Sequence, residues 1–145
     1  LRVKIENPEM FTTVLESTIN IKIYHPITGL TNDSRQIQKG DLYVAMRGQY
    51  NDGHKFLDKV YKKGAAAAIV QKSNNQINLQ QIQVKDTMNT LKELATKWRK
   101  NFDIPIIAIT GSNGKTSSKD LLLHILSYDL KVHATKGNFN TVVGL

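Results

Sequence analysis

The sequence predicts an α/β protein built from two successive domains. Short apolar segments recur along the chain with helical patterns between them, an order typical of parallel sheets covered by helices. A glycine-bounded turn at 111–114 joins one apolar segment to the helical pattern that follows it. A short proline-containing stretch at 102–105 separates the two series of elements. We therefore expect one domain at 1–102 and the beginning of a second at 103–145.

The composition fits a folded protein and excludes several classes. Of the 145 residues, 40% are apolar and 22% are charged, which is sufficient for a packed core. The absence of cysteine excludes disulfides, thiolate metal sites and a cysteine nucleophile. The apolar runs are too short to span a bilayer, and the first residues do not resemble a leader peptide. We expect a cytoplasmic protein without membrane insertion.

The net charge of +8 is concentrated in residues 1–102, which carry +7 of it. A basic surface attracts phosphate-bearing ligands, anionic lipid or nucleic acid. We interpret most of these lysines as a solvated surface, because charged side chains are rarely buried. Basic and aromatic residues are not interleaved, and no segment has the pattern of a recognition helix. A nucleic-acid partner is therefore not expected.

The first domain is predicted to alternate helices and strands. Asp52 and Gly64 are residue types that begin and end helices, and Asp86 is another helix-starting residue. The helix after Asp86 has an apolar stripe formed by Met88, Leu91, Leu94, Ala95, Trp98 and Phe102. The other expected elements are a helix at 8–17, a strand at 19–24, polar turns at 28–39, a strand at 42–46, a helix at 52–63, a strand at 66–70, a loop at 71–81 and a strand at 82–84.

The second domain is predicted to begin with a strand, a turn and a helix. Residues 106–110 are apolar without alternation, as expected for a strand buried on both faces. A second strand is expected at 132–134. The helix between them, at 115–128, is expected to turn four apolar side chains inward: Leu121, Leu122, Ile125 and Leu126.

The turn after 106–110 carries the strongest chemical signal in the sequence. It consists of Gly111, Ser112, Asn113, Gly114, Lys115, Thr116 and Ser117. Glycines let backbone N–H groups approach phosphate oxygens at a helix N-terminus, where Lys115 suits the outer phosphates and the Thr116 hydroxyl suits Mg²⁺. The general phosphate-loop motif has two more residues between its first glycine and the Gly-Lys pair. An ordinary strand–turn–helix junction would explain the glycines but not the adjacent lysine and threonine.

The segment 110–116 resembles the shortened ATP loop of the Mur ligases, cytoplasmic bacterial enzymes that build the peptide of peptidoglycan. Upstream, the segments 32–35, 39–45, 47–48 and 52–56 resemble the uridine-nucleotide domain of that family in order and spacing. The resemblance covers about residues 29–145. It implies an N-terminal uridine-nucleotide-binding domain, followed by the start of a P-loop-type parallel-sheet ATPase domain, in a fragment of a longer monomeric enzyme.

The resemblance also implies roles for individual residues. It places the nucleotide ATP on residues 111–117, with Lys115 and Thr116 as catalytic residues and Thr116 as a ligand of Mg²⁺. It assigns binding of the uridine substrate to Ser34, Arg35, Arg47, Gly48, His54, Asn138 and Asn140. Five of them also have a simpler interpretation: Ser34 and Arg35 as a side-chain-stabilised turn, His54 as a solvent-facing residue, and the two asparagines as turn residues. Asp52 is interpreted as a helix cap only.

The implied activity is ATP-dependent ligation through an acyl phosphate. Residues 136–140 most resemble the family member that joins D-alanyl-D-alanine to UDP-N-acetylmuramoyl-tripeptide, although Thr141 departs from its pattern. The member that adds the third amino acid to UDP-N-acetylmuramoyl-dipeptide is the alternative. A non-enzymatic nucleotide-binding module is another. The 145 residues alone are expected to be inactive in ligation, because other parts of the family's site lie further along the chain.

Overall fold

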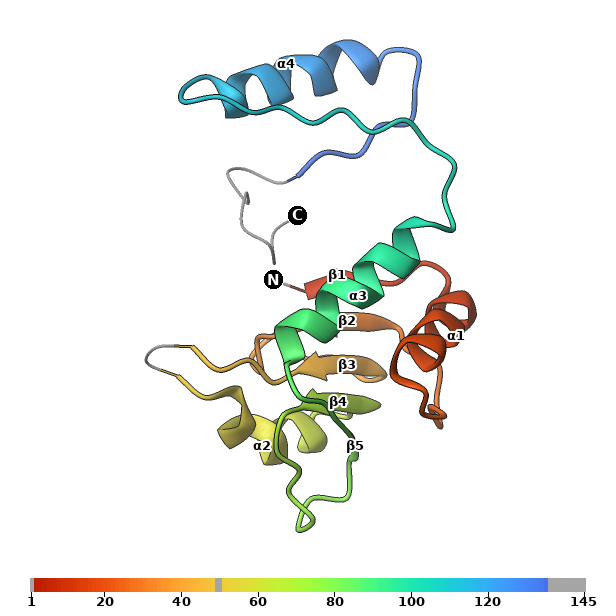
Figure 1. The fold of residues 1–145 in the computed structure, drawn as a ribbon, viewed down its shortest axis with the longest axis vertical. Coiled ribbons are helices and arrows are strands. Elements are labelled where there is room, and N and C mark those ends of the chain that lie inside the picture. The colour runs from red at the N-terminus through yellow and green to blue at the C-terminus, as the bar shows by residue number, and fades with distance from the viewer. Residues whose placement is uncertain (1, 49–50, 136–145) are drawn as a thin grey trace. The chain divides into compact units, whose positions relative to one another are not determined.

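The computed structural model describes residues 2–48 and 51–135, and the chain forms two compact units, Leu1–Phe102 (unit 1) and Asp103–Leu145 (unit 2) (Figure 1). The elements of unit 1 are β1 (Arg2–Lys4), α1 (Pro8–Ile19), β2 (Gly29–Thr31), β3 (Asp41–Val44), η1 (Gly53–Phe56), α2 (Leu57–Lys62), β4 (Ala67–Val70), β5 (Gln80–Gln83) and α3 (Thr87–Arg99). The described part of unit 2 contains the helix α4 (Lys115–Leu126).

Unit 1 is built on a five-stranded mixed sheet whose strand order is β1-β2-β3-β4-β5. β1 pairs with β2 in the antiparallel direction, whereas β2 to β5 are mutually parallel. Every residue of the central strands β3 and β4 is buried, as expected for parallel strands covered on both faces. The predicted α/β class is confirmed, and the antiparallel strand β1 is an addition to it.

Helices cover both faces of this sheet. Side chains alternate along β3, so Leu42 packs on the side of α1 and α3, whereas Tyr43 packs on the side of α2. The first core cluster, on the Leu42 side of the sheet, also contains Phe11, Leu15, Ile69, Ile82 and Leu94. The second core cluster, on the Tyr43 side, also contains Leu57, Val60, Ala68 and Val70. Figure 1 shows α3 passing over the sheet next to α1. The sheet is therefore the middle layer of three.

The predicted helix starts are confirmed by their capping hydrogen bonds. Asp52 accepts a hydrogen bond from the backbone N–H of His54, and Asp86 accepts two from Met88 and Asn89. The helix predicted at 52–63 begins as the 3₁₀ turn η1 and continues as α2. Gly64 ends it with a φ of +83°, a conformation that favours glycine.

The strand predicted at 19–24 is wrong. Ile19 is the last residue of α1, and the backbone after it pairs with a side chain instead of a strand. The Gln80 amide donates to the Lys22 carbonyl (2.6 Å) and accepts from the Tyr24 N–H (3.1 Å). Ile23, one of the alternating apolar residues of this segment, is instead buried in the first core cluster. The short strands β1 and β2 lie where the sequence pattern predicted none.

The apolar stripe of α3 is confirmed only in part. Leu94 is fully buried, and Trp98 packs edge-on against Phe11, with ring centroids 5.3 Å apart. Trp98 therefore belongs to the core, as predicted. Ala95 is exposed. Phe102 is 38% exposed because it lies beyond the end of the helix, although its ring packs edge-on against Trp98 with centroids 5.1 Å apart.

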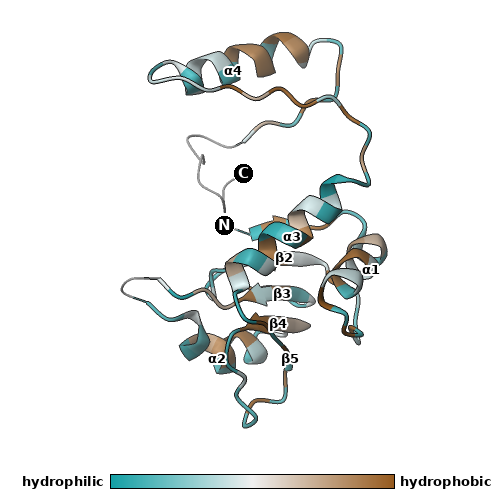
Figure 2. Ribbon diagram, in the orientation of Figure 1, coloured by the Kyte–Doolittle hydropathy of each residue, from teal (hydrophilic) through white to brown (hydrophobic). Residues whose placement is uncertain are grey.

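Unit 2 differs from the prediction in its strands. Neither 106–110 nor 132–134 is a strand, because a strand requires a hydrogen-bonded neighbour and the described part of unit 2 contains none. α4 forms as predicted, polar at its first turns and apolar towards its end (Figure 2). Its side chains Leu121 and Ile125 are exposed rather than inward. No helix among residues 2–48 and 51–135 has the length and hydropathy of a membrane span.

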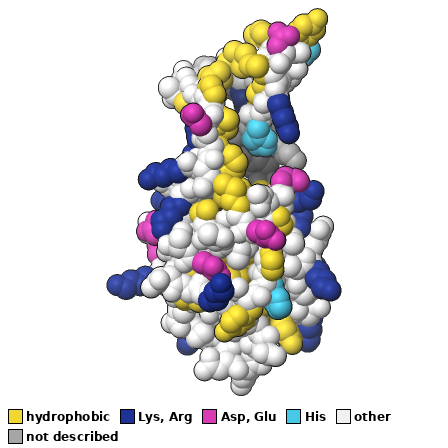
Figure 3. Space-filling view, turned by 90° about the vertical axis from the view of Figure 1, so that its right-hand side faces the viewer, with side chains coloured by type: hydrophobic (Ala, Val, Ile, Leu, Met, Phe, Trp, Pro, Cys, Tyr) yellow, Lys and Arg dark blue, Asp and Glu magenta, His cyan; other side chains and the backbone are white. Residues whose placement is uncertain are grey.

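Apolar side chains of unit 2 reach the surface over much of its length (Figure 3). No residue of α4 is buried. The large apolar residues of unit 2 that are exposed are Ile104, Ile106, Ile107, Leu121, Ile125, Tyr128 and Leu130. The described part of unit 2 therefore has no core of its own.

Candidate functional site

The carboxyl ends of β2, β3 and β4 lie along one edge of the sheet in unit 1, because these strands are parallel. The loop after β2 carries Asp33, Ser34 and Arg35, the loop after β3 carries Arg47, and Gln71 follows β4. Ligands of open α/β sheets bind outside this edge. The structure thus places Ser34, Arg35 and Arg47 in loops of the same edge, although their strands are separated in sequence.

Arg35 is fixed by the aspartate two residues before it. Its Nε and Nη2 lie 2.9 Å from the two carboxylate oxygens of Asp33, and its backbone N–H donates to the same carboxylate. The hydrogen bonds from Arg35 hold the pKa of Asp33 well below its usual range. Ser34 between them is buried, whereas the Arg35 side chain is 81% exposed. A turn stabilised by side chains is present, and it orients a cation at the surface.

Arg47 is held by a second aspartate. Arg47 and Asp52 face each other across an antiparallel bridge, and Arg47 Nε lies 3.2 Å from Asp52 Oδ2. The next residue, Gly48, closes this loop with its N–H donating to the Asn51 carbonyl (2.8 Å). Hydrogen bonds from the backbone and then the ring of His54, with a smaller one from Arg47, lower the pKa of Asp52 to about 2.

His54 joins the ends of two strands. Its Nδ1 lies 2.6 Å from Asp52 Oδ1, and its Nε2 accepts the backbone N–H of Gln71 at 2.9 Å. The side chain is 13% exposed. Both ring nitrogens are thus engaged within the protein, which does not match the simpler interpretation of His54 as a solvent-facing residue.

The turn that carries Asp52 and His54 is packed tightly against β3. A Cβ on Gly53 would lie 2.9 Å from the Met46 nitrogen and 3.1 Å from the Ala45 Cα, so only glycine fits. The buried Tyr43 hydroxyl donates to the Gly53 carbonyl at 3.1 Å. Burial, with Asp33 and Asp52 nearby, raises the pKa of Tyr43 to about 12. The Asp-Gly-His segment is therefore positioned by the sheet itself.

The glycine-bounded turn at 111–117 is the candidate phosphate loop of unit 2, called the phosphate loop below. Its backbone has the conformation that its glycines predict. Gly111 and Gly114 adopt φ values of +152° and +75°, which other residues rarely adopt. α4 begins directly after them at Lys115. The Lys115 ammonium donates to the carbonyls of Gly111 and Ser112, so it lies over the loop. Residues 111–114 and Thr116 are exposed.

This loop fits a phosphate group but supplies little to a metal. A helix N-terminus with a lysine over a glycine turn is a suitable set of donors for phosphate oxygens. The Thr116 hydroxyl is one Mg²⁺ ligand at most, and residues 2–48 and 51–135 contain no cluster of three or more His, Asp or Glu that could hold a metal. Asn138 and Asn140 lie outside the described residues.

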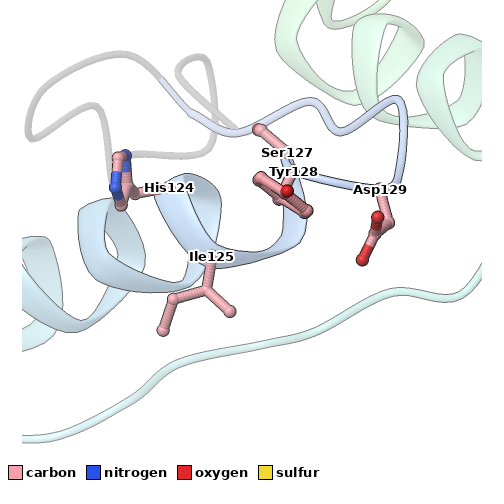
Figure 4. A pocket seen from close by; sticks show the side chains of 5 residues that line it. All are labelled: His124, Ile125, Ser127, Tyr128 and Asp129. Atoms are coloured by element: carbon pink, nitrogen blue, oxygen red, sulfur yellow. The ribbon is translucent and has the colours of Figure 1, made fainter.

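A surface hollow lies at the opposite end of α4 from the loop. Five residues line it: His124, Ile125, Ser127, Tyr128 and Asp129 (Figure 4). About nine helical residues separate it from Lys115, roughly 14 Å along the axis. It is therefore distinct from the phosphate loop.

Sequence reasoning missed the partners of the candidate residues. Asp33 could have been recognised, because an aspartate two residues before an arginine is a local signal. Gln71 could not, because its contact with His54 depends on which strands are neighbours. The buried Asp41 was also missed. Its carboxylate accepts hydrogen bonds from Nε and Nη2 of Arg2 at 2.7 Å and 2.8 Å, and it lies at the other end of β3.

Two family profiles match the chain. The Mur ligase family catalytic domain matches residues 26–99, and the Mur ligase middle domain matches residues 109–145. A UDP-N-acetylmuramoyl-tripeptide–D-alanyl-D-alanine ligase of Synechocystis sp. is 35% identical over 133 residues, 90% of this chain and 29% of its own length. A UDP-N-acetylmuramoyl-L-alanyl-D-glutamate–2,6-diaminopimelate ligase of Oceanobacillus iheyensis is 37% identical over 123 residues, 81% of this chain and 24% of its own length.

Solved structures agree. The UDP-N-acetylmuramoylalanyl-D-glutamyl-2,6-diaminopimelate–D-alanyl-D-alanyl ligase of Acinetobacter baumannii has a TM-score of 0.84 and 31% identity, covering 92% of this chain and 31% of its own. A MurF ligase of Thermotoga maritima, solved in complex with ADP, has a TM-score of 0.73 and 33% identity. The match covers 79% of this chain and 27% of the Thermotoga chain. The chain thus spans about a quarter to a third of the relatives that it matches. By its profiles, its relatives and its fold, the chain belongs to the Mur ligase family.

Proposed function

We propose that this chain is the N-terminal part of an ATP-dependent ligase that joins D-alanyl-D-alanine to UDP-N-acetylmuramoyl-tripeptide. The observation that carries the proposal is the match of the Synechocystis ligase over 90% of the chain, through both the Asp-Gly-His segment and the phosphate loop. The ADP complex of the Thermotoga relative supports an adenine nucleotide as the ligand of this family.

In the proposed reaction, ATP transfers its terminal phosphoryl group to the C-terminal carboxylate of the peptide. The amine of D-alanyl-D-alanine then attacks this acyl phosphate, loses a proton and displaces inorganic phosphate as the amide bond forms. The chain's own contribution is positioning and charge neutralisation by Lys115 and the backbone of 111–114. Mg²⁺ would neutralise phosphate charge, with the Thr116 hydroxyl as one ligand from this chain.

Unit 1 is proposed to hold the uridine diphosphate part of the substrate. Arg35 and Arg47 supply guanidinium groups at one sheet edge, and these suit a diphosphate by charge and by their forked donors. Ser34 and Gly48 lie in the same two loops as these arginines. Ser34 is proposed to hydrogen-bond the substrate, and Gly48 is proposed to let the backbone approach it. Asn138 and Asn140 are proposed to contact the substrate from unit 2.

The direct test measures phosphate release by the longer ligase that carries this chain. ATP, Mg²⁺ and UDP-N-acetylmuramoyl-tripeptide are supplied with and without D-alanyl-D-alanine. A parallel reaction contains the dipeptide precursor and a diamino acid. Release that requires D-alanyl-D-alanine supports the proposal, and release only in the parallel reaction overturns the choice of acceptor.

A pair of lysine variants tests the role of the phosphate loop in the same assay. Lys115→Met should reduce turnover by about a hundredfold or more, the loss typical of removing a group that stabilises transition-state charge. Lys131→Met is the matched control, because Lys131 is an exposed lysine of the same unit outside the loop. Equal rates for the two variants would contradict the assigned role of Lys115.

The ligase that adds the third amino acid is the second candidate. The Oceanobacillus relative, which carries that activity in its name, is 37% identical over 81% of the chain. We favour the D-alanyl-D-alanine ligase because four solved structures of ligases of that kind resemble this chain with TM-scores of 0.73 to 0.84. The two acceptor reactions above distinguish the candidates directly.

A further inference from the structure

We propose that His54 is a positioning residue: its neutral ring, protonated on Nδ1, fixes the Asp52 carboxylate and through it the Arg47 guanidinium, without contacting the ligand. The inference rests on the proposed function in one respect, namely that Arg47 faces a uridine nucleotide. It assigns to His54 a different role from the substrate contact that the family resemblance implies.

The hydrogen bonds of the ring determine its tautomer. The backbone N–H of Gln71 can only donate, so His54 Nε2, 2.9 Å away, accepts and carries no proton. The single proton of the neutral ring is then on Nδ1, which donates to Asp52 Oδ1 at 2.6 Å. A second proton would set two N–H groups against each other at Gln71.

The carboxylate of Asp52 divides its oxygens between the two partners. Oδ1 accepts from the backbone and the ring of His54, and Oδ2 accepts from Arg47 Nε at 3.2 Å. Rotation of the carboxylate would move both oxygens together. The ring therefore restricts the direction in which the carboxylate can hold the guanidinium.

Exposure increases along this series of side chains. The His54 side chain is 13% exposed, that of Asp52 is 27% exposed, and that of Arg47 is 66% exposed. The buried end is anchored to the backbone that follows β4, and the exposed end lies in the loop after β3. This order is expected of a support that presents a cation to a ligand, and it leaves the ring itself little access to one.

The test uses two variants that each keep half of the ring's function. An asparagine amide lies near the position of Nδ1, so His54→Asn retains a donor to Asp52. A glutamine amide lies near the position of Nε2, so His54→Gln retains an acceptor for Gln71 but loses the donor to Asp52. Calorimetric titration of the 145-residue chain with UDP should show about tenfold weaker binding for His54→Gln, equivalent to one lost charge-assisted hydrogen bond, and a smaller loss for His54→Asn.

A double-mutant cycle separates positioning from direct contact. If His54 acts through Arg47, then His54→Gln should cause no further loss of UDP affinity in an Arg47→Ala background. Losses that multiply would overturn the proposal. His25→Gln is the matched control, because His25 is exposed in the same unit, and it should bind UDP as the wild type does.

A ligand-free arm distinguishes failure of this inference from failure of the proposed function. Long-range proton–nitrogen NMR spectra of the wild type should show His54 protonated on Nδ1 at neutral pH, and the Arg47 Nε–H signal should shift in His54→Gln but not in His25→Gln. A ring protonated on Nε2, or an unchanged Arg47 signal, would overturn the positioning role. Absence of UDP binding to the wild type, with these spectra as expected, would instead reject the uridine site.

Discussion

The two units of the chain treat similar apolar segments in opposite ways. In unit 1 the central strands β3 and β4 are buried at every residue. In unit 2 the isoleucines Ile104, Ile106 and Ile107 are 58%, 66% and 60% exposed. The difference shows that an apolar run becomes a buried strand only where neighbouring strands and covering helices are available to it.

The candidate sites differ in the same way. At the sheet edge of unit 1, β3 holds Gly53 through the Tyr43 hydroxyl, and the segment after β4 holds His54 through the Gln71 N–H. In the described part of unit 2 the Lys115 ammonium of the phosphate loop donates to carbonyls three and four residues away. Unit 1 thus fixes its site through tertiary structure, whereas the phosphate loop depends on its glycines and one helix.

The largest expected difference between the units is in amide hydrogen exchange. Amides of β3 and β4 should be protected at least about a thousandfold, because they open only with the unfolding of unit 1. Amides of 106–110 should exchange nearly as fast as those of an unfolded chain, because these residues do not form a strand in the described part of unit 2. Exchange followed by mass spectrometry measures both in one sample. Comparable protection of these strands and of the apolar segment of unit 2 would contradict the proposed difference between the two units.

Unit 1 should be sensitive to the loss of one partner of the ion pair between Arg2 and Asp41. Asp41 is fully buried, and Arg2 binds both of its carboxylate oxygens. Arg2→Met would leave a buried charge without its partner and should lower the free energy of unfolding by about 3 kcal/mol. Urea denaturation measures this, with the exposed Lys4→Met as control. A loss below about 1 kcal/mol would show that the pair adds little.

Two glycine substitutions should show different physical causes in the two units. Gly53→Ala meets the backbone of Ala45 and Met46 at 2.9–3.1 Å and should cost about 1–3 kcal/mol by overpacking. Gly114→Ala meets nothing within 4 Å, and its cost of about 1 kcal/mol arises from its φ of +75° alone. Thermal melts of unit 1 should therefore respond to Gly53→Ala and not to Gly114→Ala. The reverse order would contradict the packing argument.

The smallest expected effect is on the acid side of the stability curve. The pKa of Asp52 is lowered to about 2 in the folded chain, against about 3.9 when unfolded. Its ionised form therefore stabilises the fold above about pH 4, and this contribution is lost as the pH falls towards about 2. Melting temperatures measured from pH 5 to pH 2 should fall less steeply for Asp52→Asn. Asp58→Asn is the control at an exposed aspartate. The same slope for Asp52→Asn as for the wild type would contradict the stabilising role of the Asp52 carboxylate.

Much of unit 1 could be predicted because its signals are local. Asp52 and Asp86 cap helices through residues two or three positions away, and 66–70 is apolar at every position. The strand predicted at 19–24 failed because a Gln80 side chain, distant in sequence, pairs with that backbone. The contact of His54 with Gln71 was beyond prediction for the same reason. In unit 2 the helix and its glycine turn were predictable because their signals are local. The strands were not, because strand formation depends on pairing with a neighbouring strand, which an apolar run does not show by itself.

The most direct test of the central claim follows which unit responds to a uridine nucleotide. Titrating the isotope-labelled 145-residue chain with UDP, and recording amide NMR shifts, separates the sheet edge of unit 1 from the phosphate loop. Signals of residues 33–35, 47–48 and 52–54 should move in a saturable way, while those of Gly111 to Thr116 stay in place. Saturable shifts confined to the phosphate loop, or none at the sheet edge, would contradict the assignment of the uridine substrate to unit 1.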